Sequence, residues 1–532
     1  MDNYFLKPIK GIIFKHNFKF LLLLLLFQSL LWVSSAYKEK ASEDAMWFAE
    51  EAYFFANDGY VHSNFFKDFY GRGEKVVSFH RLFVYANAMI VKLFGFHLWT
   101  IRLNSYISAV IIMAILFAFV LKKHSIGIAV STVLFWWLCM ENFYAMKIGR
   151  PEMMLALMGL ISFIFLHKFF ISDKLWAAAL AGIFAGLSAY VHLNGLIFIC
   201  AGGCLLLFHK KRFIAISLYS LCIFAVLSHY AYDVFIDWDL YKYQLSSPFY
   251  GDKSHLSLIK LAINFFNEQK RYFWDAGSIA VSIILIVSLI IIVYIRSKKQ
   301  LCISFSDKIL FTYTLFIMLF AGLLLHDKRP HYATILYPFF ALMVAKSISI
   351  FIKKNTTLPK WITILAEISI LLFISVGFTG EIHHIVTTEK QNLVRVNQKA
   401  AQYMPEGSCC VAPMNFIFEE IADYTIVSLL LANFYVDNKP HFRGYKITPE
   451  TLYEFCKTRN IDYAVETKYA EKHDRLRFES KEDLVPFFDI IVMNDDFHIL
   501  KVNNSAPNAF NDECNKIWLK INTPTKSIWI SH

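Results

Sequence analysis

The sequence predicts an α-helical polytopic membrane protein with about eleven transmembrane helices, followed by a C-terminal α/β domain on the non-cytoplasmic side. Three observations predict this fold class. Of the 532 residues, 57% are hydrophobic, and the mean hydropathy of +0.44 is too high for a soluble domain of this size. Apolar stretches long enough to span a bilayer recur as far as residue 380. The net charge is +11, and lysine and arginine gather in the loops between these apolar stretches.

The first apolar stretch, FLLLLLLFQSLLWVSSA, follows several lysines and ends in small residues that resemble a signal-peptidase site. It is about twenty residues long, which exceeds a usual signal core. We therefore expect a retained helix and keep cleavage as the alternative. In both cases the chain from residue 37 onward emerges on the outer face.

Ten further apolar stretches are expected to cross the membrane. The basic clusters between them fall in loops that this count makes cytoplasmic, which agrees with the positive-inside rule. The stretches lie near residues 101–121, 126–145, 153–171, 175–191, 195–208, 213–231, 276–295, 308–325, 332–352 and 360–380.

The segment FHRLFVYANAMIVKLFG (79–95) decides how many helices are predicted to cross the membrane and on which side the later loops lie. It is apolar, but it carries polar residues that include His80 and Arg81, and if it crossed the membrane every later basic loop would change sides. We therefore expect an amphipathic helix that lies in the membrane interface. The first external loop then runs from about 37 to 100, within a membrane domain of residues 1–380.

Residues 381–532 are predicted to form a small α/β domain outside the cytoplasm. SCCVAP, IDYAVE, DIIVMND and FHILKV have the pattern of strands, the last two as a hairpin, whereas FEEIADYTIVSLLLANF and ETLYEFCKTRN have the pattern of helices. Thr448 and Pro449 suit the cap and the first position of the second helix. An oxidising compartment would permit a disulfide. The cysteines of this tail are Cys409, Cys410, Cys456 and Cys514.

Two carboxylates outside the membrane are candidate catalytic groups. Asp44, beside Glu43, lies just beyond the first helix at the start of an expected interfacial helix, and an N-cap role is the alternative interpretation. Glu152 follows Arg150 and Pro151, where the alternative is an acid in the first turn of a helix. A carboxylate at a membrane interface can accept a proton from an acceptor hydroxyl or amine.

Cations on the same side form the second part of the candidate site. Lys75 follows Glu74 in the first external loop, and a later external loop reads HDKRPHY. A basic patch on this face suggests an anionic partner such as phosphate, with lipid headgroups as the alternative. Such cations could stabilise a departing phosphate. The candidates in the later loop are Lys328, Arg329, His331 and Tyr332.

The leading acidic motif resembles that of the GT-C glycosyltransferases, in the branch that contains protein O-mannosyltransferases and lipid A aminoarabinose transferases. In EDAMWFAEEAYFFANDGY, Asp44 is similar in position to the family's first external aspartate. The family usually has glutamate next, where this chain has Ala45, and this leaves Glu43 as a weaker candidate.

Later motifs extend the resemblance over about residues 15–355. Lys75 is similar to the lysine of a Lys-Pro motif, although the proline is missing, and RPE (150–152) resembles a basic-Pro-acid motif. KRPHYATILYPFFALMVA resembles the family's late-helix motif, and HLNG (192–195) stands where Thr-Lys-Gly is frequent.

The resemblance implies a sugar donor carried on a polyprenyl monophosphate, inversion at the anomeric carbon, and catalysis by Asp44 and Glu152. The acceptor would be a lipid, a glycan or a protein, and no nucleic-acid partner is expected. Some GT-C enzymes use a divalent cation, and the sequence leaves this open. The implied donor-phosphate residues are Lys75, Lys328, Arg329 and Tyr332, supported by Glu43, Glu74, Arg150 and His331.

Three alternatives remain at this stage. A transporter or flippase of lipid-linked substrates would place polar residues within the spans. An O-antigen-ligase-like transferase would use a diphosphate donor, and a catalytically dead scaffold would lack the acidic residues. For the glycosyltransferase, we expect a multi-pass protein of the inner (plasma) membrane, with its active site and C-terminal domain on the periplasmic side.

Overall fold

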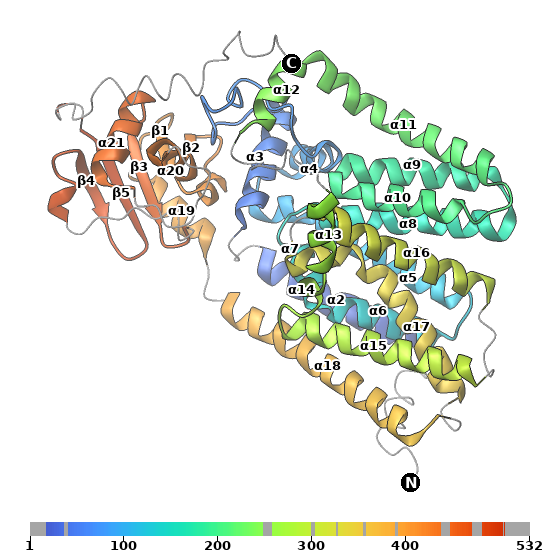
Figure 1. The fold of residues 1–532 in the computed structure, drawn as a ribbon. Coiled ribbons are helices and arrows are strands. Elements are labelled where there is room, and N and C mark those ends of the chain that lie inside the picture. The colour runs from blue at the N-terminus through green and yellow to red at the C-terminus, as the bar shows by residue number, and fades with distance from the viewer. Residues whose placement is uncertain are drawn as a thin grey trace.

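The computed structural model divides into a helical bundle and a smaller domain built on a five-stranded sheet (Figure 1). The sheet domain lies beside α3 (Glu43–Asp58) and α4 (Arg81–Phe94) at one end of the bundle. The structure describes residues 17–36, 41–247, 258–298, 304–325, 328–354, 358–388, 392–437, 447–470, 481–503 and 505.

Each apolar stretch predicted to span the membrane contains a helix. Within the described residues, six helices are long and apolar enough to cross a membrane, or seven if α6 and α7, bent by 68°, form one span. The chain therefore has the helices of a multi-pass membrane protein, and the number that cross stays a prediction. The bundle helices are α2 (Asn17–Ala36), α5 (Leu98–Leu121), α6 (Ile126–Leu138), α7 (Met140–Lys147), α8 (Glu152–Ser172), α9 (Leu175–Val191), α10 (Leu196–Leu206), α11 (Arg212–Ile236), α15 (Ala276–Ser297), α16 (Phe305–Leu324), α17 (Tyr337–Lys354) and α18 (Lys360–Thr388).

Shorter helices lie between these at the end of the bundle that faces the sheet domain. The predicted span 332–352 begins later than expected, because Pro330 opens a 3-10 helix before α17. The predicted interfacial segment 79–95 forms α4, which packs on α3 and α5. The short elements are α12 (Trp238–Leu245), α13 (Leu258–Phe266), α14 (Gln269–Tyr272), η1 (Leu193–Gly195) and η3 (Pro330–Ile335).

Basic loops gather at the opposite end of the bundle. Lys210, at the turn before α11, pairs with Asp173 at 2.5 Å, and Lys123, after α5, donates a hydrogen bond to Ser306 at the start of α16. These contacts join loops that the sequence assigns to the cytoplasm, and they lie far from the sheet domain (Figure 1). Positive charge is thus concentrated at one end, as the positive-inside rule predicts.

The segment predicted to be the first external loop packs against the sheet domain. Met46 and Phe66 of the loop share one hydrophobic core with Val411 of the domain. The backbone N–H of Ser428 also donates a hydrogen bond to the carbonyl of Phe65 at 3.2 Å. Burial of apolar surface between the two holds them together, so both lie at the same end of the molecule.

The C-terminal domain has the strand order β2-β1-β3-β5-β4, with β1 parallel to β2 and β3, and β5 antiparallel to β3 and β4. The four predicted strands and the predicted hairpin are present. Thr448 caps α21 with its side chain, and Pro449 is the first helical residue, as predicted. The strands are β1 (Cys409–Ala412), β2 (Thr425–Ser428), β3 (Tyr463–Thr467), β4 (Phe488–Met493) and β5 (Phe497–Val502), and the helices are α19 (Leu393–Ala401), α20 (Leu429–Asp437) and α21 (Pro449–Thr458).

The prediction of one helix over residues 418–434 is wrong. Residues 425–428, Thr-Ile-Val-Ser, form β2 beside β1, and helix α20 begins only at Leu429. The β-branched run favours a strand, and pairing with β1 supplies the hydrogen bonds that a helix would have given. The helical spacing of the apolar residues in this segment did not reveal the neighbouring strand.

The tail cysteines that the structure describes are unpaired. Cys409, Cys410 and Cys456 are free thiols, and Cys514 lies outside the described residues. Burial raises the pKa of the Cys409 thiol to about 11, which keeps it protonated and unreactive. Helix α18 continues to Thr388, past the predicted division at residue 380.

A buried carboxylate fixes α3 to the loop that follows it. The Glu50 side chain accepts a hydrogen bond from the Ser63 hydroxyl at 2.5 Å and another from the Phe65 N–H at 2.9 Å. Burial raises the pKa of Glu50 to about 8, even though these donors lower it. Glu51 is also buried, and burial likewise raises its pKa to about 8 against the attraction of Arg72.

This burial predicts that stability falls as the pH rises. The folded pKa of Glu50 lies above the unfolded value of 4.5, so its contribution is complete below 4.5 and is lost as the pH rises through 8. We expect the thermal midpoint in detergent to fall between pH 5 and pH 9, and Glu50→Gln to flatten that slope. The exposed Glu74→Gln is the control. Equal slopes in wild type and Glu50→Gln would contradict the assignment.

Candidate active site

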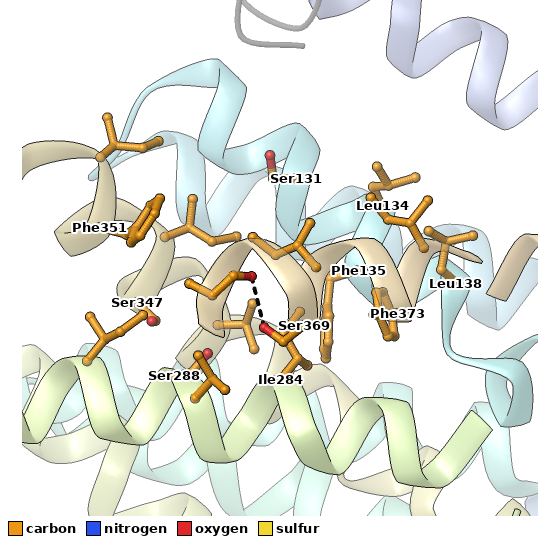
Figure 2. Close-up of a pocket in the computed structure, with 18 residues that line it drawn as sticks. Ser131, Leu134, Phe135, Leu138, Ile284, Ser288, Ser347, Phe351, Ser369 and Phe373 are labelled. Carbon is orange, nitrogen blue, oxygen red and sulfur yellow. Dashed lines mark hydrogen bonds between the residues drawn. The ribbon is translucent and has the colours of Figure 1, made fainter. Parts of the chain in front are cut away.

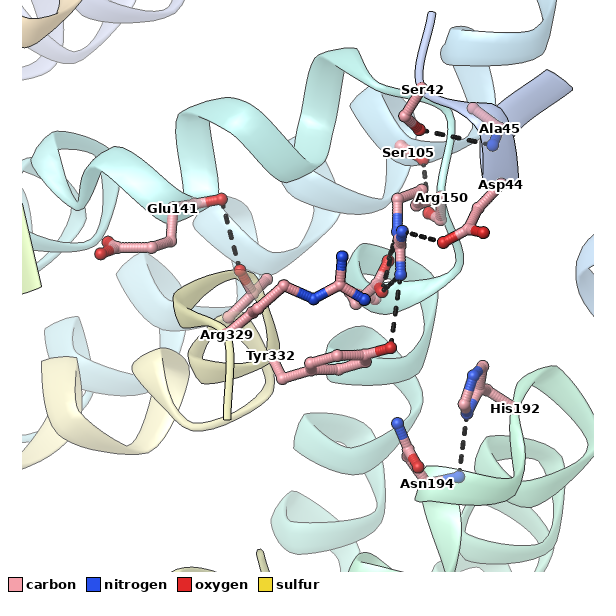
Figure 3. A network of polar contacts seen from close by, with 12 residues as sticks. Ser42, Asp44, Ala45, Ser105, Glu141, Arg150, His192, Asn194, Arg329 and Tyr332 are labelled. Atoms are coloured by element: carbon pink, nitrogen blue, oxygen red, sulfur yellow. Dashed lines mark hydrogen bonds and ion pairs between the residues drawn. The ribbon is translucent and has the colours of Figure 1, made fainter. Parts of the chain in front are cut away.

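Asp44 lies in the first turn of α3 with its side chain 47% exposed. The N-cap of this helix is Ser42, whose hydroxyl accepts a hydrogen bond from the Ala45 N–H at 3.4 Å (Figure 3). The alternative in which Asp44 caps the helix is therefore wrong, because the preceding serine takes that position. Asp44 is left to interact with other parts of the chain.

Arg150, between α7 and α8, connects the candidate carboxylates (Figure 3). It donates to Glu152 from Nε at 3.1 Å and from Nη2 at 2.8 Å, and from Nη1 it donates to Asp44 Oδ2. Nη2 also lies 3.4 Å from the Tyr332 hydroxyl. Burial disfavours the charged guanidinium, but the two carboxylates outweigh it and raise the pKa of Arg150 well above its ordinary value. Arg150 is therefore a permanent cation between two acids.

The loop that carries Arg150 is held against α5. The Ser105 hydroxyl donates a hydrogen bond to the Arg150 carbonyl at 2.9 Å. Gly149 has φ +68°, and a Cβ there would lie 3.2 Å from the Ile101 carbonyl oxygen. Only glycine takes this conformation and close approach without strain. These contacts hold the backbone at Gly149 and Arg150 in place, and this positions the Arg150 side chain between the two carboxylates.

The loop HDKRPHY contributes from the other side through η3. The Thr334 hydroxyl ties η3 to α7 by a hydrogen bond of 3.3 Å to the Glu141 carbonyl. His331 packs on the Tyr332 ring at a centroid distance of 4.3 Å. Arg329 is exposed and extends toward Arg150 in Figure 3. The predicted Arg329 and Tyr332 are thus brought to the Asp44 and Glu152 carboxylates.

Lys328 lies beside Arg329 in sequence, and it contacts Glu268 and Gly322. Its Nζ donates to Glu268 at 2.8 Å and to the Gly322 carbonyl at 3.0 Å, and its side chain is buried. Glu268 also accepts a hydrogen bond from Arg271 Nε at 2.9 Å. Lys328 therefore stabilises the packing of α16 against the segment before α14, and its predicted phosphate contact stays untested.

Lys75 also has a partner outside the Arg150 group. Its Nζ lies 2.5 Å from Asp237 Oδ2, beyond the end of α11. The buried Gln244 of α12 accepts from the Val77 N–H at 2.9 Å and donates to the Lys75 carbonyl at 2.7 Å. The loop that carries Lys75 is therefore fixed to α12. The supporting candidates Glu74, which is exposed, and Glu43, which is half-buried beside Asp44, stay predictions.

No family model and no curated protein sequence matches the chain at a significant level. Solved structures do match. ArnT from Cupriavidus metallidurans bound to undecaprenyl phosphate is similar with a TM-score of 0.58 at 12% identity, over 92% of this chain and 99% of that chain. The chain has the GT-C fold. Lower TM-scores are found for the Archaeoglobus fulgidus oligosaccharyltransferase AglB with an inhibitory peptide and a dolichol-phosphate (0.47, 11% identity, 85% of this chain and 70% of that chain) and for the arabinosyltransferase EmbB from Mycobacterium smegmatis (0.43, 14% identity, 74% and 42%).

Within this GT-C fold, two histidines near the candidate acids were missed by the sequence analysis as site residues. His80, at the start of α4, stacks on His192, before η1, with ring centroids 4.3 Å apart. Burial, followed by the neighbouring His192, holds the pKa of His80 well below its ordinary value, while Glu152 and Asp44 act in the opposite direction. His80 is therefore neutral at physiological pH. The two residues lie more than a hundred positions apart, and no local pattern connects them.

The candidate site offers few ligands for a metal ion. Among the residues that the structure describes, no group of three or more His, Cys, Asp or Glu side chains is arranged to hold a metal ion. The carboxylates that could bind a cation are already paired with Arg150. Dependence on a divalent cation therefore stays an open expectation from the resemblance.

Proposed function

We propose that the protein is a membrane glycosyltransferase that moves a sugar from a polyprenyl-phosphate-linked donor to a lipid, glycan or protein acceptor. The observation that carries this proposal is the convergence of Asp44 and Glu152, from segments far apart in sequence, on one buried arginine. The fold supports it, because the similar ArnT structure was determined with undecaprenyl phosphate bound. The basic loops and the candidate site lie at opposite ends of the helical bundle. By the positive-inside rule, this arrangement suits an enzyme whose site lies outside the cytoplasm.

In the proposed reaction Asp44 is the general base. Arg150 bonds Oδ2 of Asp44, and the half-exposed carboxylate keeps its second oxygen for the acceptor. That oxygen takes the proton while the acceptor oxygen or nitrogen attacks the anomeric carbon. The bond from this carbon to the phosphate oxygen breaks on the opposite face, which inverts the configuration. Glu152 holds Arg150 in position, and Arg150 in turn orients Asp44. The role of Glu152 is therefore to orient Asp44 through Arg150.

The departing phosphate carries the bonding electrons and must be stabilised as its negative charge grows. Arg329 and Tyr332 are the candidates for this role, because the Arg329 side chain extends toward Arg150 and the Tyr332 hydroxyl lies 3.4 Å from Arg150 Nη2 (Figure 3). Charge-assisted hydrogen bonds from a guanidinium to phosphate are short and strong. Lys75 is already paired with Asp237, which offsets part of its charge, so its effect should be smaller.

Binding of undecaprenyl phosphate to the purified chain tests this assignment. Arg329→Ala should weaken binding by about tenfold, because it removes a charge-assisted contact. Lys75→Ala should weaken it less. Lys468→Ala is a matched control for Lys75, since Lys468 pairs with Asp496 at 2.6 Å and is similarly exposed, but lies in the sheet domain. Equal affinity of wild type, Arg329→Ala, Lys75→Ala and Lys468→Ala for undecaprenyl phosphate would contradict this phosphate-binding role. It would favour the alternative, in which these cations contact lipid headgroups.

The proposal also places the site on the periplasmic side. Cysteine-accessibility labelling in intact cells, in a background without the native cysteines, would test the side. Glu406→Cys, which is exposed in the sheet domain, should react with an impermeant maleimide, whereas the exposed Lys210→Cys should not. The reverse pattern would overturn the proposed orientation.

A further inference from the structure

A large cavity with several polar side chains in its lining lies beside Arg329. Its volume is about 770 Å³, and α7, η3 and the segments that begin α15 and end α18 enclose it. This volume falls in the range of ligand-binding pockets. The proposed reaction assigns no role to it. Its polar lining includes Glu141, Asp275, Arg329, His331, Thr379 and His383.

Glu141 is the unusual member of this lining. The residue is 4% exposed, and neither carboxylate oxygen has a hydrogen-bond partner in the structure. The Tyr337 hydroxyl is its neighbour, but the contact does not reach hydrogen-bond geometry. A buried carboxylate without donors is costly, so a ligand that brings hydrogen-bond donors to Glu141 would be favoured.

Two aromatic rings in the same lining narrow the class of ligand. Trp274 is 58% exposed and Tyr144 is 40% exposed, although both line the cavity. The flat face of such a ring suits the C–H face of a pyranose, while Glu141 and Thr379 suit its hydroxyl groups. A sugar ring carries both kinds of surface, whereas a simple cation would satisfy the carboxylate alone.

A second, apolar cavity shares α15 and α18 with the first, and Figure 2 shows the side chains that line it. It has a volume of about 180 Å³, and it lies among α6, α15, α17 and α18. Successive residues of α18 line the two cavities, Ile374 the apolar one and Ser375 the polar one. Helices α15 and α18 are both candidate membrane spans. An apolar chain could therefore lie in the second cavity while its headgroup occupies the first.

We propose that the two cavities together bind a neutral glycolipid, with Glu141 and Trp274 holding its sugar headgroup. Arg329, the arginine of this lining, is already assigned by the proposed reaction to the donor phosphate on its Arg150 side. The two carboxyl groups that remain in the cavity, Glu141 and Asp275, favour a headgroup without phosphate, and this disfavours the donor lipid. The occupant would then be the acceptor of the transfer. That last assignment rests on the proposed function, whereas binding of the glycolipid does not.

Photoaffinity labelling with a diazirine-bearing dodecyl β-D-glucoside would test this site in the full chain, reconstituted in liposomes. We expect labelled peptides from α15 and α18, and competition by unmodified dodecyl glucoside. Glu141→Gln and Trp274→Ala should each lower this labelling about tenfold. Glu381→Gln is the matched control, because Glu381 is another buried acid without hydrogen bonds, on α18 but outside the cavity lining.

Two results would overturn the proposal. One is equal labelling of wild type, Glu141→Gln and Trp274→Ala. The other is equal labelling by a dodecyl phosphate probe with the same diazirine. Because labelling needs no sugar transfer, its failure is separate from failure of the proposed activity, which is measured through Asp44.

Discussion

Asp44→Asn is expected to lower sugar transfer by at least about a hundredfold while the protein remains folded. Asparagine has nearly the same shape and can still accept the hydrogen bond from Arg150, but it cannot take a proton from the acceptor. The side chain is 47% exposed, so the loss of its charge should cost little stability. Transfer would be measured with purified protein and lipid-linked sugars extracted from membranes of the expression host.

Glu43→Gln is the matched control for this experiment. Glu43 precedes Asp44 in the same turn of α3 and is half-buried, yet Arg150 bonds Asp44 and Glu152. We expect this variant to keep its activity within a few-fold of wild type. Near-normal turnover by Asp44→Asn, with an unchanged thermal midpoint, would reject Asp44 as the base and leave it a structural partner of Arg150.

Hydropathy and charge were sufficient to predict the architecture. In a bilayer the backbone N–H and C=O groups must bond within the chain, so a long apolar stretch that spans it forms a helix independently of the segments around it. Helix α4 could be kept out of the spans because His80 and Arg81 would be costly in lipid. The strand β2 was missed, since Thr425 to Ser428 gain their hydrogen bonds from β1 and not from local sequence.

For the candidate site, the sequence motifs mark single positions and do not show which side chains meet. The motifs marked Asp44 and Glu152 as candidate acids and Arg150 as a supporting residue, whereas in the structure Arg150 is the residue that joins them. Lys328 was predicted as a phosphate ligand from its place in the basic loop, and that role stays a prediction. Its partner Glu268 is sixty residues away, and no spacing rule connects the two.

Arg150→Met should have the second large effect, and it should act on stability as well as on transfer. Glu152 is only 3% exposed, and Arg150 is the cation that neutralises it. Removing one partner of a buried ion pair leaves a buried charge without compensation, which costs roughly 3–5 kcal/mol. We expect a lower thermal midpoint in detergent together with loss of transfer, because Asp44 also loses its orienting contact.

A double variant separates these two effects. In Arg150→Met combined with Glu152→Gln, the uncompensated charge is gone, so most of the lost stability should return. Transfer should not return, since Asp44 still has no arginine to orient it. Arg150→Lys keeps the charge but loses the planar fork that bonds Glu152 and Asp44 together, and it should be folded and strongly impaired. If the double variant were as unstable as Arg150→Met, burial of Glu152 would not be the cause. If the double variant were active, Arg150 would act only in folding, and Asp44 would need another explanation for its position.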